Sequence, residues 1–146
     1  MTRGTVMVMK SFDYIKVYLL TFGVFLGIDF IWLSFVAQSF YQEQIGFLLM
    51  KQPNVFAAFL FYAIYVVGIL YFVLLPALKS KKISAAHVAL AGGFYGFVAY
   101  ATYDLTNYAT IEGWPLTLVV VDMIWGFVLT GAVSGLSFIL ARKFIK

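Results

Sequence analysis

The sequence predicts an all-α integral membrane protein, a bundle of four transmembrane helices with a short interfacial helix in the first outer loop. Of its 146 residues, 64% are hydrophobic and 11% are charged, whereas a soluble domain has about 45–50% apolar and about 25% charged residues. The mean hydropathy is +0.98. A soluble fold of this size could not bury so much apolar surface, because small domains bury only about two-thirds of what the unfolded chain exposes. Composition therefore excludes a soluble globular domain and a disordered chain.

Four apolar runs are long enough to cross the hydrocarbon core, which takes roughly 20 residues. We expect spans at about residues 14–37, 55–78, 84–108 and 116–141, within a single membrane domain that covers residues 1–146. Backbone groups in lipid must be hydrogen-bonded within the protein, so each span is either a helix or a strand of a closed barrel. Runs of this length, without turn residues at about every ten positions, exclude the barrel.

The two outer loops carry signals of their own. Residues 38–54 form the first, and their apolar side chains predict a short helix lying on the membrane surface. Pro53 and Asn54 end this loop with a typical helix-initiation signal. In the second outer loop, we expect Trp114 to anchor the chain at the interface and Pro115 to occupy a first helical turn.

The basic residues indicate the orientation of the chain, because positive residues mark the cytoplasmic side of a membrane. Nine of the ten lie on one side of the expected membrane, namely Arg3, Lys10, Lys16, Lys79, Lys81, Lys82, Arg142, Lys143 and Lys146. Only Lys51 lies on the other side. We therefore expect both termini in the cytoplasm and a multi-pass protein of the bacterial inner membrane. Because the basic residues stand at span ends and form no patch, a nucleic-acid partner is excluded.

Residue types that support redox and metal chemistry are scarce. The chain has no cysteine and a single histidine, His87. This excludes disulfides, cysteine-ligated zinc or iron–sulfur centres, and haem held by two histidines. We expect no cofactor and no metal site.

Three of the six acidic residues, Asp29, Asp104 and Asp122, fall inside expected spans. A carboxylate in hydrocarbon is costly, so such residues usually face a protein interior or a water-filled cavity. At about 1.5 Å per residue, they lie about 13, 6 and 9 Å below the outer ends of three different spans. This agreement in depth predicts one shared polar site that faces outwards.

No basic residue lies at that depth to neutralise the carboxylates. They must be protonated, hydrogen-bonded by neutral donors, hydrated or bound to a cation, and we expect at least one to hold a proton at neutral pH. Helical spacing places neutral donors on the same faces, and an Asp-x-Ile-Trp pattern at 29–32 and 122–125 is expected to bring an indole N–H to two of the carboxylates. The candidate ligand-binding residues are Asp29, Asp104, Asp122, Trp32, Trp125, Tyr100, Tyr103 and Asn107, and no catalytic residue is assigned.

Glycines recur at the spacing that lets helices pack closely in a membrane. Gly-x-x-x-Gly occurs at 23–27, 92–96 and 131–135. We expect these pairs to bring the first, third and fourth spans together, and these are the spans that carry the aspartates.

Several segments are distinctive as sequence. They are Tyr103-Asp-Leu-Thr-Asn107, Gly113-Trp-Pro115 and the two Asp-x-Ile-Trp segments. Together they resemble a bacterial family of small predicted membrane proteins, catalogued as a domain of unknown function. The resemblance covers nearly the whole chain and implies a four-span inner-membrane protein without an assigned reaction. Genes of this family often stand beside genes for modifying membrane lipids, and this neighbourhood points to lipid chemistry or lipid handling.

Three classes of function fit these features. The favoured one is binding or carrying a small molecule or lipid in an outward-facing acidic pocket, with a cation or an amine among the candidate ligands. The second is a lipid-modifying enzyme whose aspartates act as acid and base, and the sequence leaves open whether the protein is an enzyme. The third is a structural or accessory subunit. Membrane lipids are expected partners, and a homodimer is considered because four spans are few to enclose a pathway.

Overall fold

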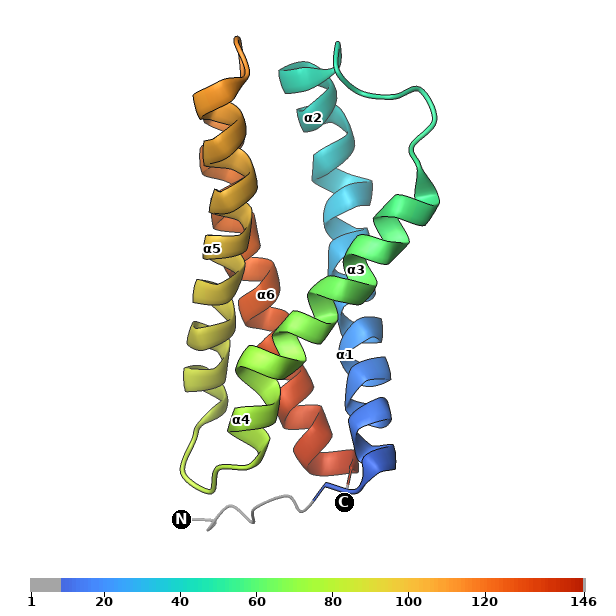
Figure 1. The fold of residues 1–146 in the computed structure, drawn as a ribbon, viewed down its shortest axis with the longest axis vertical. Coiled ribbons are helices and arrows are strands. Elements are labelled where there is room, and N and C mark those ends of the chain that lie inside the picture. Colours follow the sequence, from blue (N-terminus) through green and yellow to red (C-terminus); the bar gives the residue numbers. More distant parts are fainter. Residues whose placement is uncertain (1–8, 146) are drawn as a thin grey trace.

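The computed structural model describes residues 9–145, and all regular structure in that range is helical. The elements are α1 (Ser11–Trp32), η1 (Leu33–Ala37), α2 (Gln38–Ile45), α3 (Val55–Ile69), η2 (Leu70–Leu74), α4 (Leu75–Leu78), α5 (Ala85–Thr110) and α6 (Leu116–Phe144). The two π-helical turns η1 and η2 continue their neighbours, so the chain forms four long rods that run alternately up and down (Figure 1). The predicted all-α class is confirmed.

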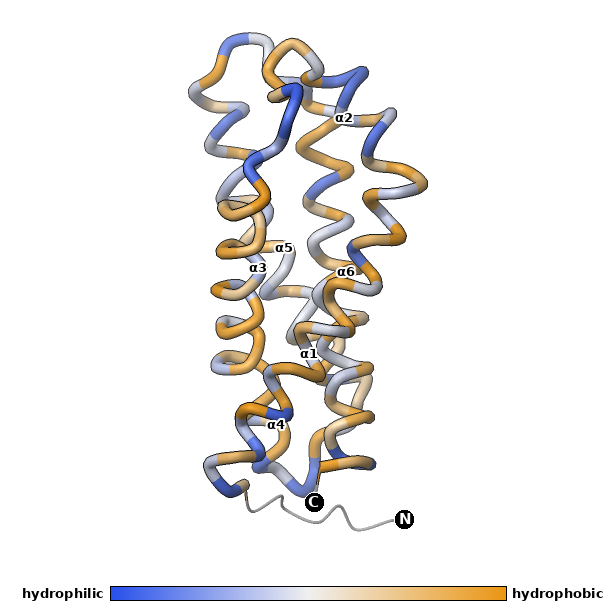
Figure 2. Tube along the Cα trace, turned by 90° about the vertical axis from the view of Figure 1, so that its right-hand side faces the viewer, coloured by the Kyte–Doolittle hydropathy of each residue, from blue (hydrophilic) through white to orange (hydrophobic). Residues whose placement is uncertain are grey.

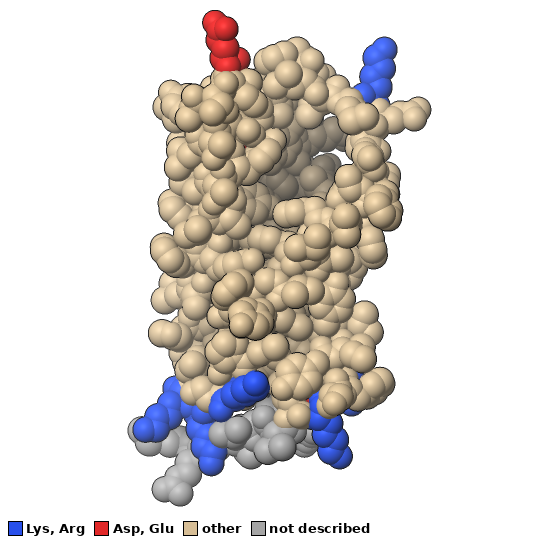
Figure 3. Space-filling model, in the orientation of Figure 1, with Lys and Arg blue, Asp and Glu red and all other residues tan. Residues whose placement is uncertain are grey.

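Three rods of the described chain are long and apolar enough to cross a membrane: Ser11–Ile45, Val55–Leu78 and Leu116–Phe144. Hydrophobic residues dominate the middle of the rods (Figure 2), and on the face drawn in Figure 3 the visible charged side chains stand at the two ends of the molecule, with an uncharged belt between them. Many large apolar side chains are exposed on this belt, as expected for a surface that faces lipid. The protein is therefore a multi-pass membrane protein.

The remaining rod, α5, has 26 residues, a length of about 39 Å, but its sequence is less apolar than those of the other three rods. The half of α5 away from the gathered Lys and Arg side chains (Figure 3), which we call the outer half, exposes Thr102, Thr106 and Thr110. Each hydroxyl donates to the carbonyl four residues earlier, so these threonines are satisfied within their own helix. Such local bonding makes a threonine-bearing face compatible with lipid.

The tightest helix contact lies between α5 and α6. A Cβ added to Gly96 would lie 2.0 Å from the backbone oxygen of Gly126, and one added to Gly92 would lie 2.2 Å from Ser134 Oγ. The expectation for the pairs at 92–96 and 131–135 is confirmed, since Gly131 and Gly135 likewise face Ala89. The expectation for 23–27 is wrong: within the described chain, a Cβ at either of these glycines would meet nothing within 4 Å.

The helix that we expected in the first outer loop is present as α2, but η1 makes it the direct continuation of α1 (Figure 1). Asn54 caps α3 as predicted, and its side chain accepts from Ala57 N at 3.0 Å. Trp114 differs from the prediction because it is only 7% exposed and packs inwards. Gly113, with φ +76°, supplies the left-handed turn that points this indole into the bundle.

Candidate functional site

The three membrane-embedded aspartates are all buried. Asp29 of α1 is 6% exposed, Asp104 of α5 is 0% exposed and Asp122 of α6 is 5% exposed. Two tyrosines from other elements, Tyr41 of α2 and Tyr62 of α3, reach the same region. We call these five residues the acidic cluster.

Asp122 accepts a very short hydrogen bond from the hydroxyl of Tyr41. The π turn η1 accounts for this contact. Twelve positions separate Asp29 from Tyr41, so in an uninterrupted α-helix Tyr41 would point about a third of a turn away from Asp29. A π turn holds more residues per turn than an α turn does. Each residue of η1 therefore turns the chain through a smaller angle about the helix axis, and Tyr41 comes back to the inner face.

Asp29 accepts a hydrogen bond of 2.7 Å from the hydroxyl of Tyr62. A second bond between the same rods joins Tyr18 Oη to the carbonyl of Ala63 at 3.2 Å. The aromatic rings of Phe25 and Tyr62, 5.3 Å apart, fill the space between these bonds. Asp29 is therefore both buried and hydrogen-bonded, and it helps to hold α3 against α1.

Asp104 has a different environment. Among residues 9–145, neither of its carboxylate oxygens has a hydrogen-bond partner, and the nearest helix, α6, carries another carboxylate, Asp122. We expected neutral donors from its own helix, and this expectation is wrong. Tyr100 packs its ring against Gly126, and Asn107 lies beside Tyr103. A buried acceptor without a donor is rare in folded proteins, so Asp104 requires an explanation.

The two tryptophans of the Asp-x-Ile-Trp segments stack on each other. The ring centroids of Trp32 and Trp125 are 4.3 Å apart, and the rings are 12° from parallel. Trp125 lies near Asp29 of the opposite helix, and Trp32 lies near Tyr41. Within the described residues neither Nε1 has a hydrogen-bond acceptor. The expected indole–carboxylate bond within each segment is therefore wrong, because the segments instead face each other across antiparallel helices.

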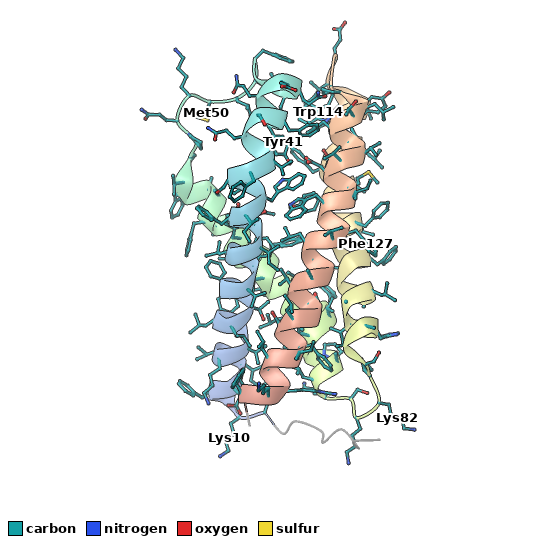
Figure 4. All side chains as sticks on the ribbon, turned by 180° about the vertical axis from the view of Figure 1, so that it is seen from behind. Lys10, Tyr41, Met50, Lys82, Trp114 and Phe127 are labelled. Atoms are coloured by element: carbon teal, nitrogen blue, oxygen red, sulfur yellow. The ribbon has the colours of Figure 1, made fainter. Side chains whose placement is uncertain are left out.

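Packed side chains lie on both sides of the acidic cluster along the bundle. Ile45, Trp114, Leu118 and Val119 form a buried cluster towards the outer end, which we call the outer cap. Figure 4 shows Trp114 and Tyr41 near the end of the bundle that lies opposite Lys10 and Lys82. On the other side, the hydroxyls of Tyr65 and Thr130 are 2.8 Å apart and both side chains are buried. Below them the main apolar core begins.

The sides of this region are more open than its ends. A cleft of about 360 Å³ lies between α3, α5 and α6, and it is lined by Phe61, Tyr65, Ala99, Tyr100, Tyr103 and Asp122. A second groove of about 450 Å³ lies between α1 and α3, and it is lined by Leu26, Gly27, Asp29, Phe30, Leu33 and Tyr62. Figure 3 shows the surface hollowed in the half away from the gathered Lys and Arg side chains. Both openings face the apolar belt and end at a carboxylate.

The cluster offers acceptors for hydrogen bonds and negative charge. Within the described chain, no group of three or more His, Cys, Asp or Glu side chains is arranged to hold a metal ion. Of the predicted site residues, the structure places the three aspartates, the two tryptophans and Tyr100 around one region, whereas Tyr103 is largely exposed and lines the cleft. Their assignment as ligand-binding residues stays a prediction.

Sequence reasoning missed the two tyrosines that bond the aspartates. Tyr62 lies about two turns below the outer start of its rod, as Asp122 does in α6. Comparing the depth of polar residues in all four spans would have found it. Tyr41 was taken as part of a surface helix, and its inward direction depends on η1, for which the sequence carries no signal that we recognise.

This fold and this cluster define a multi-pass α-helical membrane protein with acidic residues buried between its helices. The chain belongs to the family described as Predicted membrane protein (DUF2177), which it matches over residues 14–139. The match includes all five residues of the acidic cluster and confirms the resemblance noted from the sequence. The family has no assigned function. Comparisons with curated proteins and with solved structures gave no match.

Proposed function

We propose that the protein binds or carries a small molecule or lipid through its acidic cluster, in the inner membrane of a bacterium. The observation that carries this proposal is Asp104, which is fully buried beside Asp122 and lacks a donor within residues 9–145. Leaving a buried acceptor unpaired costs about 1–3 kcal/mol, and more when it is charged. Ionisable residues inside membranes usually mark function, and a ligand that supplies donors would remove this cost.

The proposed topology has four spans, with α5 as the third, and both termini in the cytoplasm. It is supported by the basic residues at the end of the bundle where α1 begins and α6 ends (Figures 1 and 3). Arg3 and Lys146 lie outside the described residues. Reporter fusions test the topology: a reporter active in the cytoplasm should work at the C-terminus, and one active in the periplasm should work at Lys51. A periplasmic reporter that works at the C-terminus would contradict it.

Native mass spectrometry of the protein, released from mild detergent, tests the binding proposal directly. We expect the wild type to retain a bound small molecule or lipid and Asp104→Asn to lose it, because an amide neither balances a cation nor offers two acceptors. Glu112→Gln is the matched control, since Glu112 is an exposed carboxylate in the outer loop. Identical adducts on wild type and a folded Asp104→Asn protein would overturn the proposal.

A structural role has support at two of the three aspartates. Asp29 and Asp122 accept hydrogen bonds from Tyr62 and Tyr41, which join different rods, and polar side chains commonly hold membrane helices together in this way. That explanation does not extend to Asp104, which makes no such bond within the described chain. Full ligand retention by Asp104→Asn would leave the structural role as the better account.

A further inference from the structure

The acidic cluster lies between two packed regions along the bundle, and the two openings described above lie at its sides. The outer cap of Ile45, Trp114, Leu118 and Val119 lies between the cluster and the outer loops. The joined hydroxyls of Tyr65 and Thr130, with the apolar core beyond them, close the inner side. A ligand from the aqueous phase would therefore have to displace packed apolar side chains, whereas a ligand from the membrane would not.

The cleft beside α3 has the character of a site for an alkyl chain. Its walls are mostly aromatic, with Phe61 and Tyr65 on one side and Tyr100 and Tyr103 on the other, and Ala99 leaves room between them. Its only charged lining residue in the described chain is Asp122. A volume of about 360 Å³ lies within the range of ordinary ligand pockets, roughly 300–1,000 Å³. An apolar chain can thus lie in the cleft while a polar head reaches the carboxylate.

The head group must match Asp122, which lines the cleft, and Asp104, which is buried next to the lining residue Tyr103. Ionised Asp104 and Asp122 accept hydrogen bonds and donate none. The two carboxylates lie on α5 and α6, which pack against each other, and the sequence places no Lys or Arg at their depth. A primary ammonium carries one positive charge and three N–H donors. It can therefore satisfy both oxygens of Asp104 while balancing charge beside Asp122, and aromatic rings near the path favour a cation as well.

We propose that the acidic cluster takes the primary ammonium head of a membrane amphiphile that enters sideways between α3 and α5. This inference rests on the proposed binding function and adds the ligand class and its path. The shared chemistry is an alkyl chain with an ammonium head, supplied either by a free long-chain amine or by an aminophospholipid.

Three probes separate the chemical requirements. Dodecylammonium, butylammonium and dodecyltrimethylammonium are titrated into the full chain in a neutral detergent, and tryptophan fluorescence reports binding because Trp32 and Trp125 adjoin the cluster. Butylammonium should bind at least about tenfold more weakly than dodecylammonium, because it buries less apolar surface. Dodecyltrimethylammonium, which has no N–H, should also bind at least about tenfold more weakly. Equal affinities for all three probes would overturn the ligand class.

Two phenylalanine substitutions on α5 test the path. Ala99→Phe fills the cleft, whereas Ala91→Phe is the matched control, because Ala91 lines a groove with Phe72 and Val98 that contains no carboxylate. Ala99→Phe should weaken dodecylammonium binding about tenfold, and Ala91→Phe should leave it unchanged. Wild-type affinity in a folded Ala99→Phe protein, together with lost binding in Asp104→Asn, would overturn sideways access but keep the binding function. Wild-type affinity in Asp104→Asn as well would overturn both.

An alkyl chain that carries bromine tests the same path without altering the cleft. Brominated dodecylammonium should quench the fluorescence of Trp32 and Trp125 in a Trp114→Phe background, and unlabelled dodecylammonium should reverse the quenching. Absence of quenching would contradict a chain lying in the cleft. Nanodiscs distinguish the sources: competition by phosphatidylethanolamine, and not by phosphatidylcholine, would identify an aminophospholipid, whereas competition by neither would identify a free amine.

Discussion

The two halves of the bundle are held together by different means. Towards the basic end, α5 and α6 meet through glycines, and large side chains such as Leu74, Leu78 and Val133 are completely buried. Towards the outer end, the rods meet through carboxylates, phenols and two stacked indoles. In a bilayer, apolar packing and polar bonds both hold helices together. The inner half is thus held together by close packing, and the outer half by polar contacts that leave one buried carboxylate, Asp104, without a donor within residues 9–145.

The largest expected effect is at the glycine contact. Gly96→Leu should lower the free energy of unfolding by about 3 kcal/mol, because its Cβ would lie 2.0 Å from the backbone oxygen of Gly126. Gly23→Leu is the matched control, since within the described chain a Cβ there meets nothing within 4 Å. Equilibrium unfolding in mixed micelles compares the two variants. Equal losses of stability in the two variants would show that the glycine pair on α5 is no more closely packed than the pair on α1.

The next-largest expected effect is a change in the free energy of unfolding whose sign differs between substitutions of two aspartates. Asp29→Leu should lower the free energy of unfolding by about 2 kcal/mol, because the hydroxyl of Tyr62 loses its acceptor. Asp104→Leu should raise it by about 1–2 kcal/mol, because it removes a buried acceptor that has no donor within residues 9–145. The same unfolding assay measures both variants in ligand-free protein. Destabilisation by Asp104→Leu would show that Asp104, like Asp29, has a structural role.

A smaller loss of stability is expected when the hydroxyl of one tyrosine is removed. Tyr62→Phe should cost about 1 kcal/mol, the usual contribution of one hydrogen bond. Tyr71→Phe serves as control because Tyr71 lies on the same rod and is 69% exposed. Thermal unfolding in detergent should separate the two variants by a few degrees. If the two proteins melted together, the bond between Tyr62 and Asp29 would contribute nothing measurable.

The smallest effect concerns the indole stack. Trp125→Phe should cost about 0.5–1 kcal/mol and should abolish the near-ultraviolet circular dichroism that arises from two coupled indoles. Trp114→Phe should keep that signal, because Trp114 packs in the outer cap and not on another tryptophan. A signal that survives Trp125→Phe would contradict the stacked arrangement.

The fold could largely be predicted from the sequence because long apolar runs leave few alternatives in lipid. Residue spacing also identified the aspartates and the glycine contact between α5 and α6. Predictions from residue spacing failed where a side-chain contact depends on rotation about a helix axis or on a partner from another rod. Tyr41 reaches Asp122 through η1, and Trp125 faces the aspartate of the opposite helix. Helical spacing within one segment cannot reveal either contact.

The turn η1 lets the first rod hold one residue more than a regular helix would while Tyr41 keeps its inward direction. A π turn contains one residue more than an α turn, so deletion of Phe35, which is 82% exposed, would restore a regular helix through this segment. Eleven positions would then separate Asp29 from Tyr41, which is about three turns of a regular α-helix, so Tyr41 would still point towards Asp122. Two relatives that differ by a single-residue gap in residues 33–37 would therefore present the same side chains to the acidic cluster, although one has a π turn there and the other has a regular helix.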